Sequence, residues 1–295
     1  MSINLPSHYV SQFATNIQLL LQQKGSRLRS SVTVGNHIGK QASPVDQVAA
    51  IAMQPVVGRF GQMGRVDAAV DRRWVFPSDF DLPQNIDSYD KLRLLLDPES
   101  VFVQNAVNAA GRQFDDLLIA AFNGTAKTGE TGATSTSFLT GNQVGVSFGG
   151  TNSGLSVAKL KEAKRLLMSH NLDLNSEELY CVIKSKQHDN LLNEIQVISQ
   201  DFNWGDMPVM KEGKVMRFLG INFIHCERLA ASSTSDLIPL YAKSGMYLGI
   251  WNDVTTDISR RNDLQGLPWQ AYVYMTAGAT RLEEKKCIQI ACYNA

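Results

Sequence analysis

The feature that most constrains this chain is one long helix predicted between Asp97 and Gly124. Asp97 is a favourable N-cap, Pro98 suits the first helical position because no N–H is needed there, and Gly124 typically ends a helix. Apolar residues between these signals repeat at alternating spacings of four and three, which predicts one buried stripe. The stripe consists of Val103, Val107, Ala110, Phe114, Leu117 and Ala121. We expect a helix of about 37 Å, at 1.5 Å per residue, with this stripe facing the core.

The chain after this helix alternates between loop, helix and strand signals. Residues 124–154 are rich in glycine, threonine and serine, which favours a mobile loop or a small exposed hairpin. Ser156 is a suitable N-cap for a helix that reaches about His170. A further helix is predicted at 185–199, and strands at 179–183, 215–219, 221–226, 237–242, 246–251, 269–276 and 287–292. The mixture predicts an α+β fold.

The part of the chain before the long helix lacks the patterning of a core. Apolar residues at helical spacing in 10–21 predict a short amphipathic helix. Turn-forming residues dominate from 35 to 90, so we expect a long β-hairpin or loop that projects from the core. Long projections that cannot bury their own backbone usually bury it on a neighbour. This pattern favours a subunit of an assembly.

The composition excludes several classes of protein. The 295 residues include 28 Lys+Arg and 28 Asp+Glu, so a nucleic-acid binder held by bulk positive charge is excluded. No apolar run approaches the ~20 residues that a membrane span needs, and no targeting segment is recognisable. The four cysteines are too sparse for a disulfide framework and are expected to be reduced thiols in the core.

Enzymatic motifs are incomplete throughout the chain. Residues 124–131 have the glycine spacing of a phosphate-binding loop, but Glu130 stands where that loop needs a lysine. The five histidines are scattered, and His225 and Cys226 should point to opposite faces of a strand. We therefore predict no catalytic residue, no cofactor and no metal.

Two charged groups are expected to be solvated or to face a partner. On the long helix, Arg112 can reach Asp115 or Asp116 three or four residues away. On the following helix, Lys159, Lys161, Lys164 and Arg165 could contact phosphate groups, although such runs usually form a solvated face.

The order of the elements resembles the major capsid proteins of tailed bacteriophages, which have the Hong Kong 97-like fold. The segments that carry the resemblance span nearly the whole chain. They are residues 22–28 (QQKGSRL), 72–73 (RR), 86–91 (IDSYDK), 97–100 (DPES), 110–116 (AGRQFDD), 120–124 (AAFNG), 213–215 (GKV), 218–223 (FLGINF), 278–281 (GATR) and 288–290 (IQI).

The resemblance implies five segments. Residues 1–45 would form an N-terminal arm, 46–95 an extended loop that overlaps a neighbouring subunit, and 96–175 a peripheral domain with the spine helix. Residues 176–262 would form an axial domain, and 263–295 would return to the peripheral domain. The function implied is self-assembly, as hexamers and pentamers, into the icosahedral head around double-stranded DNA.

The resemblance also implies partners and a location. The partners would be copies of the chain, a separate scaffolding protein, a portal, in some relatives a decoration protein, and packaged DNA bound non-specifically. The protein would assemble in the host bacterial cytoplasm and reside in the virion. Subunit contacts are expected on the projecting loop, where arginine and tryptophan are typical of interface hot spots. The residues concerned are Arg59, Arg65, Arg72, Arg73 and Trp74.

Three other functions remain open on the sequence alone. An encapsulin-like nanocompartment shell would have a similar fold and enclose a cargo enzyme. A phosphate- or nucleotide-handling enzyme would use residues 124–131. Another virion protein, such as a tail or decoration subunit, would form rings, tubes or trimers.

Overall fold

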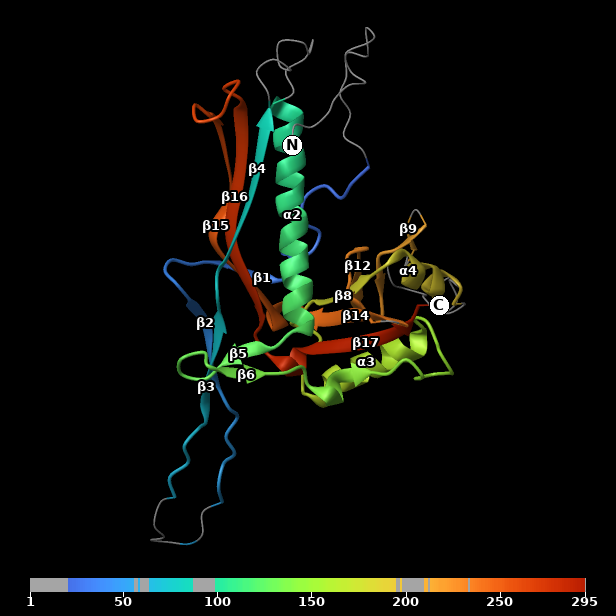
Figure 1. Ribbon diagram of the computed structural model, residues 1–295. Helices are drawn as coiled ribbons and strands as arrows, with labels where there is room; N and C mark the ends of the chain where they lie inside the picture. The colour runs from blue at the N-terminus through green and yellow to red at the C-terminus, as the bar shows by residue number, and fades with distance from the viewer. Residues whose placement is uncertain are drawn as a thin grey trace.

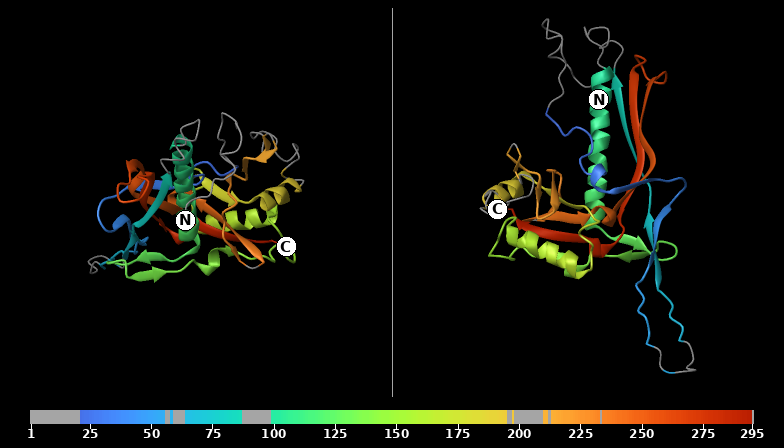
Figure 2. Two further views of the ribbon diagram at one scale, coloured as in Figure 1. Left: turned by 45° about the horizontal axis from the view of Figure 1, so that its top comes forward. Right: turned by 180° about the vertical axis from the view of Figure 1, so that it is seen from behind.

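The computed structural model describes residues 21–55, 58, 64–86, 99–194, 197, 210–211, 213–232 and 234–294. Helix α2 (Glu99–Asn123) stands upright beside a narrow sheet, and both rise from a broader sheet that carries helix α3 (Val157–Ser169) (Figure 1). The view from behind shows the same arrangement, with a thin ribbon leaving the body at the opposite end from α2 (Figure 2). The expected helix at 10–21 lies outside the described residues except for its last residue.

The narrow sheet, called the long sheet below, has four strands in the order β1 (Thr33–Asn36), β15 (Met246–Arg260), β16 (Trp269–Arg281) and β4 (Ser78–Ile86). Strand β1 runs parallel to β15, and the other pairs are antiparallel. β15 and β16 extend beyond the predicted ranges. Two register shifts between Ile250 and Thr255 interrupt the alternation by which a strand is recognised in sequence.

The broad sheet contains seven strands and joins distant parts of the chain. Its order is β11 (Arg217–Phe218), β12 (Ile221–His225), β8 (Leu179–Ile183), β14 (Ser235–Ala242), β17 (Cys287–Tyr293) and β7 (Gln143–Val144), with β13 (Ala231–Ser232) paired to β14. Helix α3 packs on β17 and β7, and its N-cap Ser156 accepts a hydrogen bond from the backbone N–H of Lys159. Helix α4 (Ser185–Leu192) is shorter than the predicted 185–199.

The remaining elements are short or belong to the ribbon. β2 (Ala42–Val48) and β3 (Val70–Val75) form the expected hairpin, and β5 (Ala126–Thr128) and β6 (Thr134–Thr136) extend its base to four strands. β9 (Met210–Lys211) pairs with β10 (Lys214–Val215). Single 3-10 turns are η2 (Arg29–Ser31), η3 (Thr140–Asn142), η5 (Lys243–Gly245) and η6 (Glu284–Lys286).

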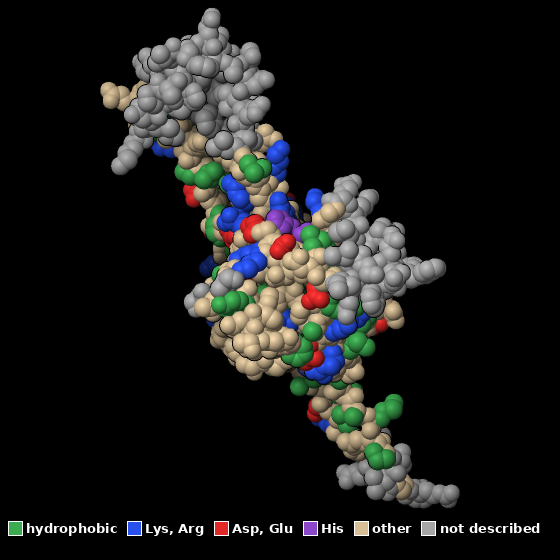
Figure 3. All heavy atoms as spheres, turned by 90° about the vertical axis from the view of Figure 1, so that its right-hand side faces the viewer, with side chains coloured by type: hydrophobic (Ala, Val, Ile, Leu, Met, Phe, Trp, Pro, Cys, Tyr) green, Lys and Arg blue, Asp and Glu red, His purple; other side chains and the backbone are tan. Residues whose placement is uncertain are grey.

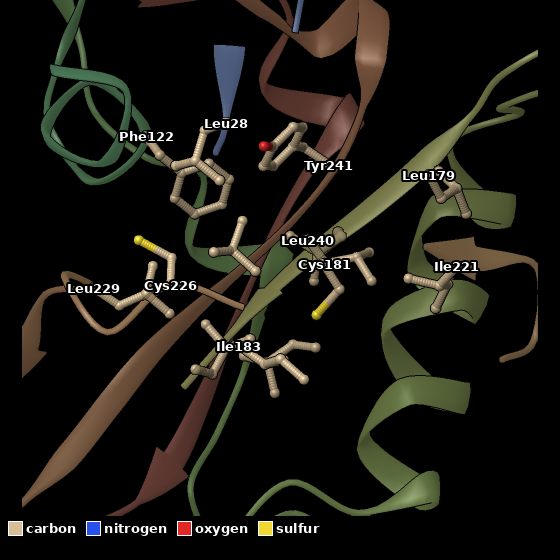
Figure 4. Close-up of a cluster of buried hydrophobic side chains, with 14 of the residues drawn as sticks. Leu28, Phe122, Leu179, Cys181, Ile183, Ile221, Cys226, Leu229, Leu240 and Tyr241 are labelled. Carbon is tan, nitrogen blue, oxygen red and sulfur yellow. The ribbon is translucent and has the colours of Figure 1, made fainter. Parts of the chain in front are cut away.

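The core lies on both sides of the broad sheet. Figure 4 shows Cys181, Ile183 and Leu240 at its centre, with Leu28 and Phe122 closing one side. On α3, Leu160, Ala163 and Leu167 are buried, while Leu166 is half-buried. These alternating strand residues and helix stripes fill one continuous cluster.

Sheet membership divides the chain differently from the segment boundaries that the family resemblance implies. β15 falls in residues 176–262 but pairs within the long sheet, together with β16. β17 falls in residues 263–295 but pairs with β14 in the broad sheet. The chain crosses between the two sheets twice after residue 242, from β14 to β15 and from β16 to β17, which a linear division into segments does not capture.

The predicted buried stripe of α2 is only partly correct. Phe114 is 1% exposed, whereas Val103 and Leu117 are half-buried and Val107 is 38% exposed, so the prediction for Val107 is wrong. The buried surface extends instead over the neighbouring face that bears Asn108, Gly111 and Asp115. Residues 22–28, called the anchor segment below, cover that face.

Asp115 fixes the anchor segment to the helix. Its two side-chain oxygens accept hydrogen bonds from the Ser26 hydroxyl at 2.6 Å, the Arg27 and Leu28 backbone N–H groups at 3.1 Å, and the Gln23 amide at 2.5 Å. The side chain is fully buried, and it forms no ion pair with any described lysine or arginine. A buried carboxylate loses its hydrogen bonds to water and is stable only if protein donors replace them. Here backbone N–H, hydroxyl and amide donors do so.

The anchor segment approaches α2 too closely for any residue but glycine at position 111. A Cβ on Gly111 would lie 2.4 Å from the backbone carbon of Gly25, which itself has φ +65°. The Gly25 N–H donates to the Asn108 side-chain oxygen at 3.3 Å. Two glycines therefore permit a contact that periodicity does not reveal.

The expected pairing of Arg112 with Asp115 or Asp116 is wrong. Arg112 donates to the Gln22 side-chain oxygen at 2.7 Å and to the Gln23 carbonyl at 3.2 Å. Asp116 pairs with Arg228. The anchor segment thus binds Arg112 and Asp115, whereas Arg228 binds Asp116.

Arg281 of β16 caps the C-terminal end of α2. Its guanidinium is fully buried and donates to the carbonyls of Ala121 at 3.1 Å and of Phe122 and Gly124 at 2.5 Å. Burial lowers the pKa of this side chain. A cation at the helix C-terminus satisfies orphan carbonyls and complements the helix dipole.

All four cysteines are buried free thiols, as predicted. Burial raises the pKa of each, to about 12 for Cys287 and Cys292, from an ordinary value of 9.0. Buried Lys159 has the opposite shift, because desolvation lowers its pKa while its ammonium donates to the Ser153 and Ala291 carbonyls at 2.8 Å.

We predict that Asp115→Asn releases the anchor segment while α2 remains folded. The substitution turns one acceptor into a donor that faces other donors, so the free energy of unfolding should fall by about 2–4 kcal/mol. Urea denaturation measures this loss, and trypsin should cut the variant faster between residues 24 and 29. Asp116→Asn is the matched control and should cost less than about 1 kcal/mol. Equal effects of the two substitutions would contradict the anchor.

We predict that stability falls in mild alkali. The folded-state pKa of each thiol lies above its unfolded value, so this stability is complete below pH 9 and declines toward pH 12. Cys181, Cys287 and Cys292 should each contribute about 1.4 kcal/mol per pH unit in that window, and Lys159, whose pKa is lowered, offsets part of this loss below its ordinary pKa of 10.5. Urea denaturation between pH 8 and 11 compares the constant stability expected below pH 9 with the decline above it. Cys181→Ala should flatten it, and an unchanged slope would refute the assignment.

Candidate assembly surfaces

The ribbon, defined as β2, β3 and the described residues between them, is fixed at its base by a buried ion pair. The Arg73 and Glu284 side chains are 6% and 13% exposed, and one guanidinium nitrogen donates to Glu284 at 2.8 Å. Gln47 accepts from Arg73 at 3.2 Å and donates to the Leu282 carbonyl. Because a buried pair that loses one partner is strongly destabilised, this network holds the ribbon to η6 in one orientation.

Arg72 and Trp74 also make contacts within the subunit. Arg72 donates to Asp46 across the hairpin at 2.5 Å, which raises the pKa of its guanidinium, and it lies 5.7 Å from the Trp74 ring centroid. The Trp74 indole N–H donates to the Gly129 carbonyl at 2.7 Å. Trp74 is half-buried and Arg72 is partly exposed. Trp74 thus fastens the base of the ribbon to the turn between β5 and β6, whereas Arg72 joins the two strands of the ribbon.

The outer part of the ribbon exposes apolar side chains. Val48, Ile51 and Val70 are between 63% and 68% exposed, Met53 is fully exposed and Val66 is 42% exposed. Figure 3 shows hydrophobic side chains gathered along this projection, with few charges among them. Nothing else in the described part of the chain covers them. Such an exposed apolar set marks a surface for association.

The five predicted interface residues are thus distributed over different environments. Arg73 is buried within the subunit, and Arg72 and Trp74 lie at the base of the ribbon. Arg65 is exposed and pairs with Asp67, whereas Arg59 lies outside the described residues. The sequence reasoning missed the apolar residues of the outer ribbon. The sequence could have indicated them, because they are isolated aliphatic residues in a segment that was expected to project from the core.

The structure gives no support to a nucleotide site at 124–131. These residues form β5 and the turn into β6, and the Lys127 ammonium donates to the Ser135 hydroxyl at 2.9 Å. Cys226 is buried while His225 is half-exposed, so the two do not act on each other. Across the described residues, no group of three or more His, Cys, Asp or Glu side chains is placed to hold a metal ion.

The described helices were also compared with the requirements of a membrane span. None of them combines the necessary length with sufficient apolar character.

Comparisons with known proteins agree with this architecture. The capsid structure of cyanophage P-SCSP1u matches with a TM-score of 0.74 at 17% identity, covering 97% of this chain and 94% of that chain. A Mycobacterium phage Che8 structure matches with a TM-score of 0.69 at 11% identity, covering 96% and 97%. The capsid of a native GTA particle matches with a TM-score of 0.68 at 13% identity, covering 100% and 99%.

A comparison with curated protein sequences gives no significant match. A family model described as phage capsid protein, however, matches residues 5–294, which is nearly the whole chain. The fold is Hong Kong 97-like, and the role is structural and not enzymatic. The alternatives raised by the sequence are not favoured. The chain belongs to the phage capsid protein family and is a major capsid protein of the virion.

Proposed function

We propose that this subunit assembles as hexamers and pentamers into an icosahedral head around double-stranded DNA, and that the outer ribbon is its principal contact with a neighbour. The observation that carries the proposal is the apolar surface of the ribbon, which the described part of the same chain leaves uncovered. Burial of such side chains stabilises association by about 25 cal/mol per Å².

The ribbon is suited to this role because its base is rigid and its outer part is free. The Arg73–Glu284 pair and the Trp74 contact fix its direction before association. Less conformational entropy is therefore lost when it meets a neighbour. A closed shell repeats this contact many times, so a modest energy per contact gives a stable particle.

The roles of the segments follow from the same arrangement. We propose that α2 and the long sheet form the peripheral part of the subunit, and that the broad sheet with α4 forms the axial part around the capsomer centre. Because α3 packs on the broad sheet, we also propose that α3 belongs to the axial part and not to the peripheral segment 96–175 expected from the sequence. A separate scaffolding protein, a portal and, where present, a decoration protein are the proposed partners. DNA would be met only through non-specific contacts, consistent with a net charge of zero. Assembly is proposed to occur in the cytoplasm of the host bacterium.

We predict that the double variant Val48→Lys/Val70→Lys folds but does not form closed shells. The two residues face each other across the hairpin, and lysine removes their apolar surface and adds two like charges. Electron microscopy and light-scattering mass, with any co-encoded scaffolding protein present, measure particle formation. The unfolding free energy should change by less than about 1 kcal/mol, because both side chains are exposed.

Met168→Lys provides the matched control. Met168 is 56% exposed on α3, outside the ribbon, and its substitution should leave shells intact. Wild-type yields of shells from the ribbon variant would overturn the proposed contact. Equal loss from both variants would show that added charge, and not the ribbon surface, prevents assembly.

A further inference from the structure

One face of helix α2 near its N-terminal end is left partly uncovered by the described residues. Figure 1 shows this half of the helix standing clear of the broad sheet, with the long sheet along one side. Val107 is 38% exposed, Val103 one turn earlier is half-buried, and Gln104 is exposed. Residues 100–111 contain no charged side chain. An uncharged and partly apolar helix face of this kind is suited to packing against a second helix.

A buried amide beside this face lacks an acceptor in the described part of the chain. Asn108 is 7% exposed, and its side-chain oxygen accepts a hydrogen bond from the Gly25 N–H. Its Nδ2 atom is buried and has no hydrogen-bond partner among the described residues. Buried polar groups in native proteins are normally paired. The Asn108 amide therefore points to an oxygen of a segment that packs on α2 at this level.

The chain that precedes the anchor segment has the pattern that this face requires. Gln22 binds Arg112 of α2, so the chain before residue 22 starts beside the helix, and Leu21 is fully exposed. Residues 10–21 contain no charged side chain. Their apolar residues at helical spacing are Val10, Phe13, Ala14, Ile17, Leu20 and Leu21. A helix this short is marginal in water unless its apolar side is packed.

The lengths of the two segments and their connection also agree. As helices, residues 13–21 would span about 12 Å and residues 101–108 about 10 Å, at 1.5 Å per residue. Only residues 22–24 separate Leu21 from Gly25, whose N–H is bound to Asn108. So short a connection gives the segment a high effective concentration at its own helix. The same subunit is therefore favoured over a neighbour as the place where the segment binds.

We propose that residues 10–21 form an amphipathic helix that packs on the face of α2 bearing Val103 and Val107 in the same subunit, and that an oxygen of this segment accepts a hydrogen bond from the Asn108 amide. The segment then continues the anchor segment along α2 and covers the two valines. This contact goes beyond the proposed assembly, because it forms within one subunit and away from the ribbon.

Disulfide formation in the full-length subunit tests where the segment binds. Ile17→Cys is combined with Val103→Cys in one variant and with Val107→Cys in another, and each is oxidised with copper phenanthroline. At least one pair should form an intrachain disulfide, detected as joined peptides by mass spectrometry. The four native thiols are buried and do not compete. Ile17→Cys/Met168→Cys is the matched control and should give no joined peptide, because Met168 is exposed on α3.

Mixing single variants separates the same subunit from a neighbour. An equimolar mixture of the Ile17→Cys and Val107→Cys chains should form no disulfide between positions 17 and 107. A disulfide in this mixture would assign the face of α2 to a neighbouring subunit and overturn the proposal. Failure of both double variants to form an intrachain disulfide would overturn it as well.

Hydrogen-exchange mass spectrometry of Val107→Asp tests the contact without added cysteines. The charge on the packed face should speed exchange in residues 10–21 roughly tenfold, the effect of losing one aliphatic contact. Residues 22–28 should stay protected, because Asp115 still binds them. Val34→Asp is the matched control, since Val34 is 40% exposed on β1, and should leave residues 10–21 unchanged. Unchanged exchange in Val107→Asp would contradict the contact, and because the ribbon is unaltered the assembly proposal would stand.

Discussion

The burial of helix α2 is the constraint on which the rest of the structure depends. The 25-residue helix has an apolar side, a polar side and an end with unpaired carbonyls, and each needs a different cover. The long sheet covers the first, the anchor segment reaches Asp115 on the second, and Arg281 caps the third. These covers come from opposite ends of the chain, so the helix joins the N-terminal and C-terminal parts into one subunit.

Local signals in the sequence predict most helices and strands. The errors arise where contacts between residues far apart in the sequence decide which side chains are buried. The capping residues predict the ends of α2 and α3 to within two residues of the ends in the structure, because a cap acts within one helical turn. Val107 was misplaced because periodicity cannot show that a carboxyl group such as Asp115 is buried under backbone donors. The ribbon was expected as a projection, but Arg73 was assigned to its surface. Its partner Glu284 is 211 residues away, and nothing near Arg73 indicates it.

The ribbon has a fixed base and an uncovered outer part, and this combination suits assembly. Its base contains a buried ion pair and a partly buried indole hydrogen bond, whereas its outer part carries apolar side chains with no cover in the described subunit. Exposed apolar surface of this kind lowers solubility unless a partner covers it. In the closed shell that we propose, the conflict is resolved because every ribbon would meet an equivalent neighbour.

The central claim is that the ribbon is buried on a neighbouring subunit, and a cryo-electron-microscopy reconstruction of the assembled particle tests it most directly. The account predicts closed icosahedral shells in which Val48, Ile51, Met53, Val66 and Val70 change from exposed to buried against an adjacent copy. Closed shells with these side chains still in solvent would contradict the role of the ribbon. A protein that remains monomeric, alone and with its scaffolding protein, would contradict the account as a whole.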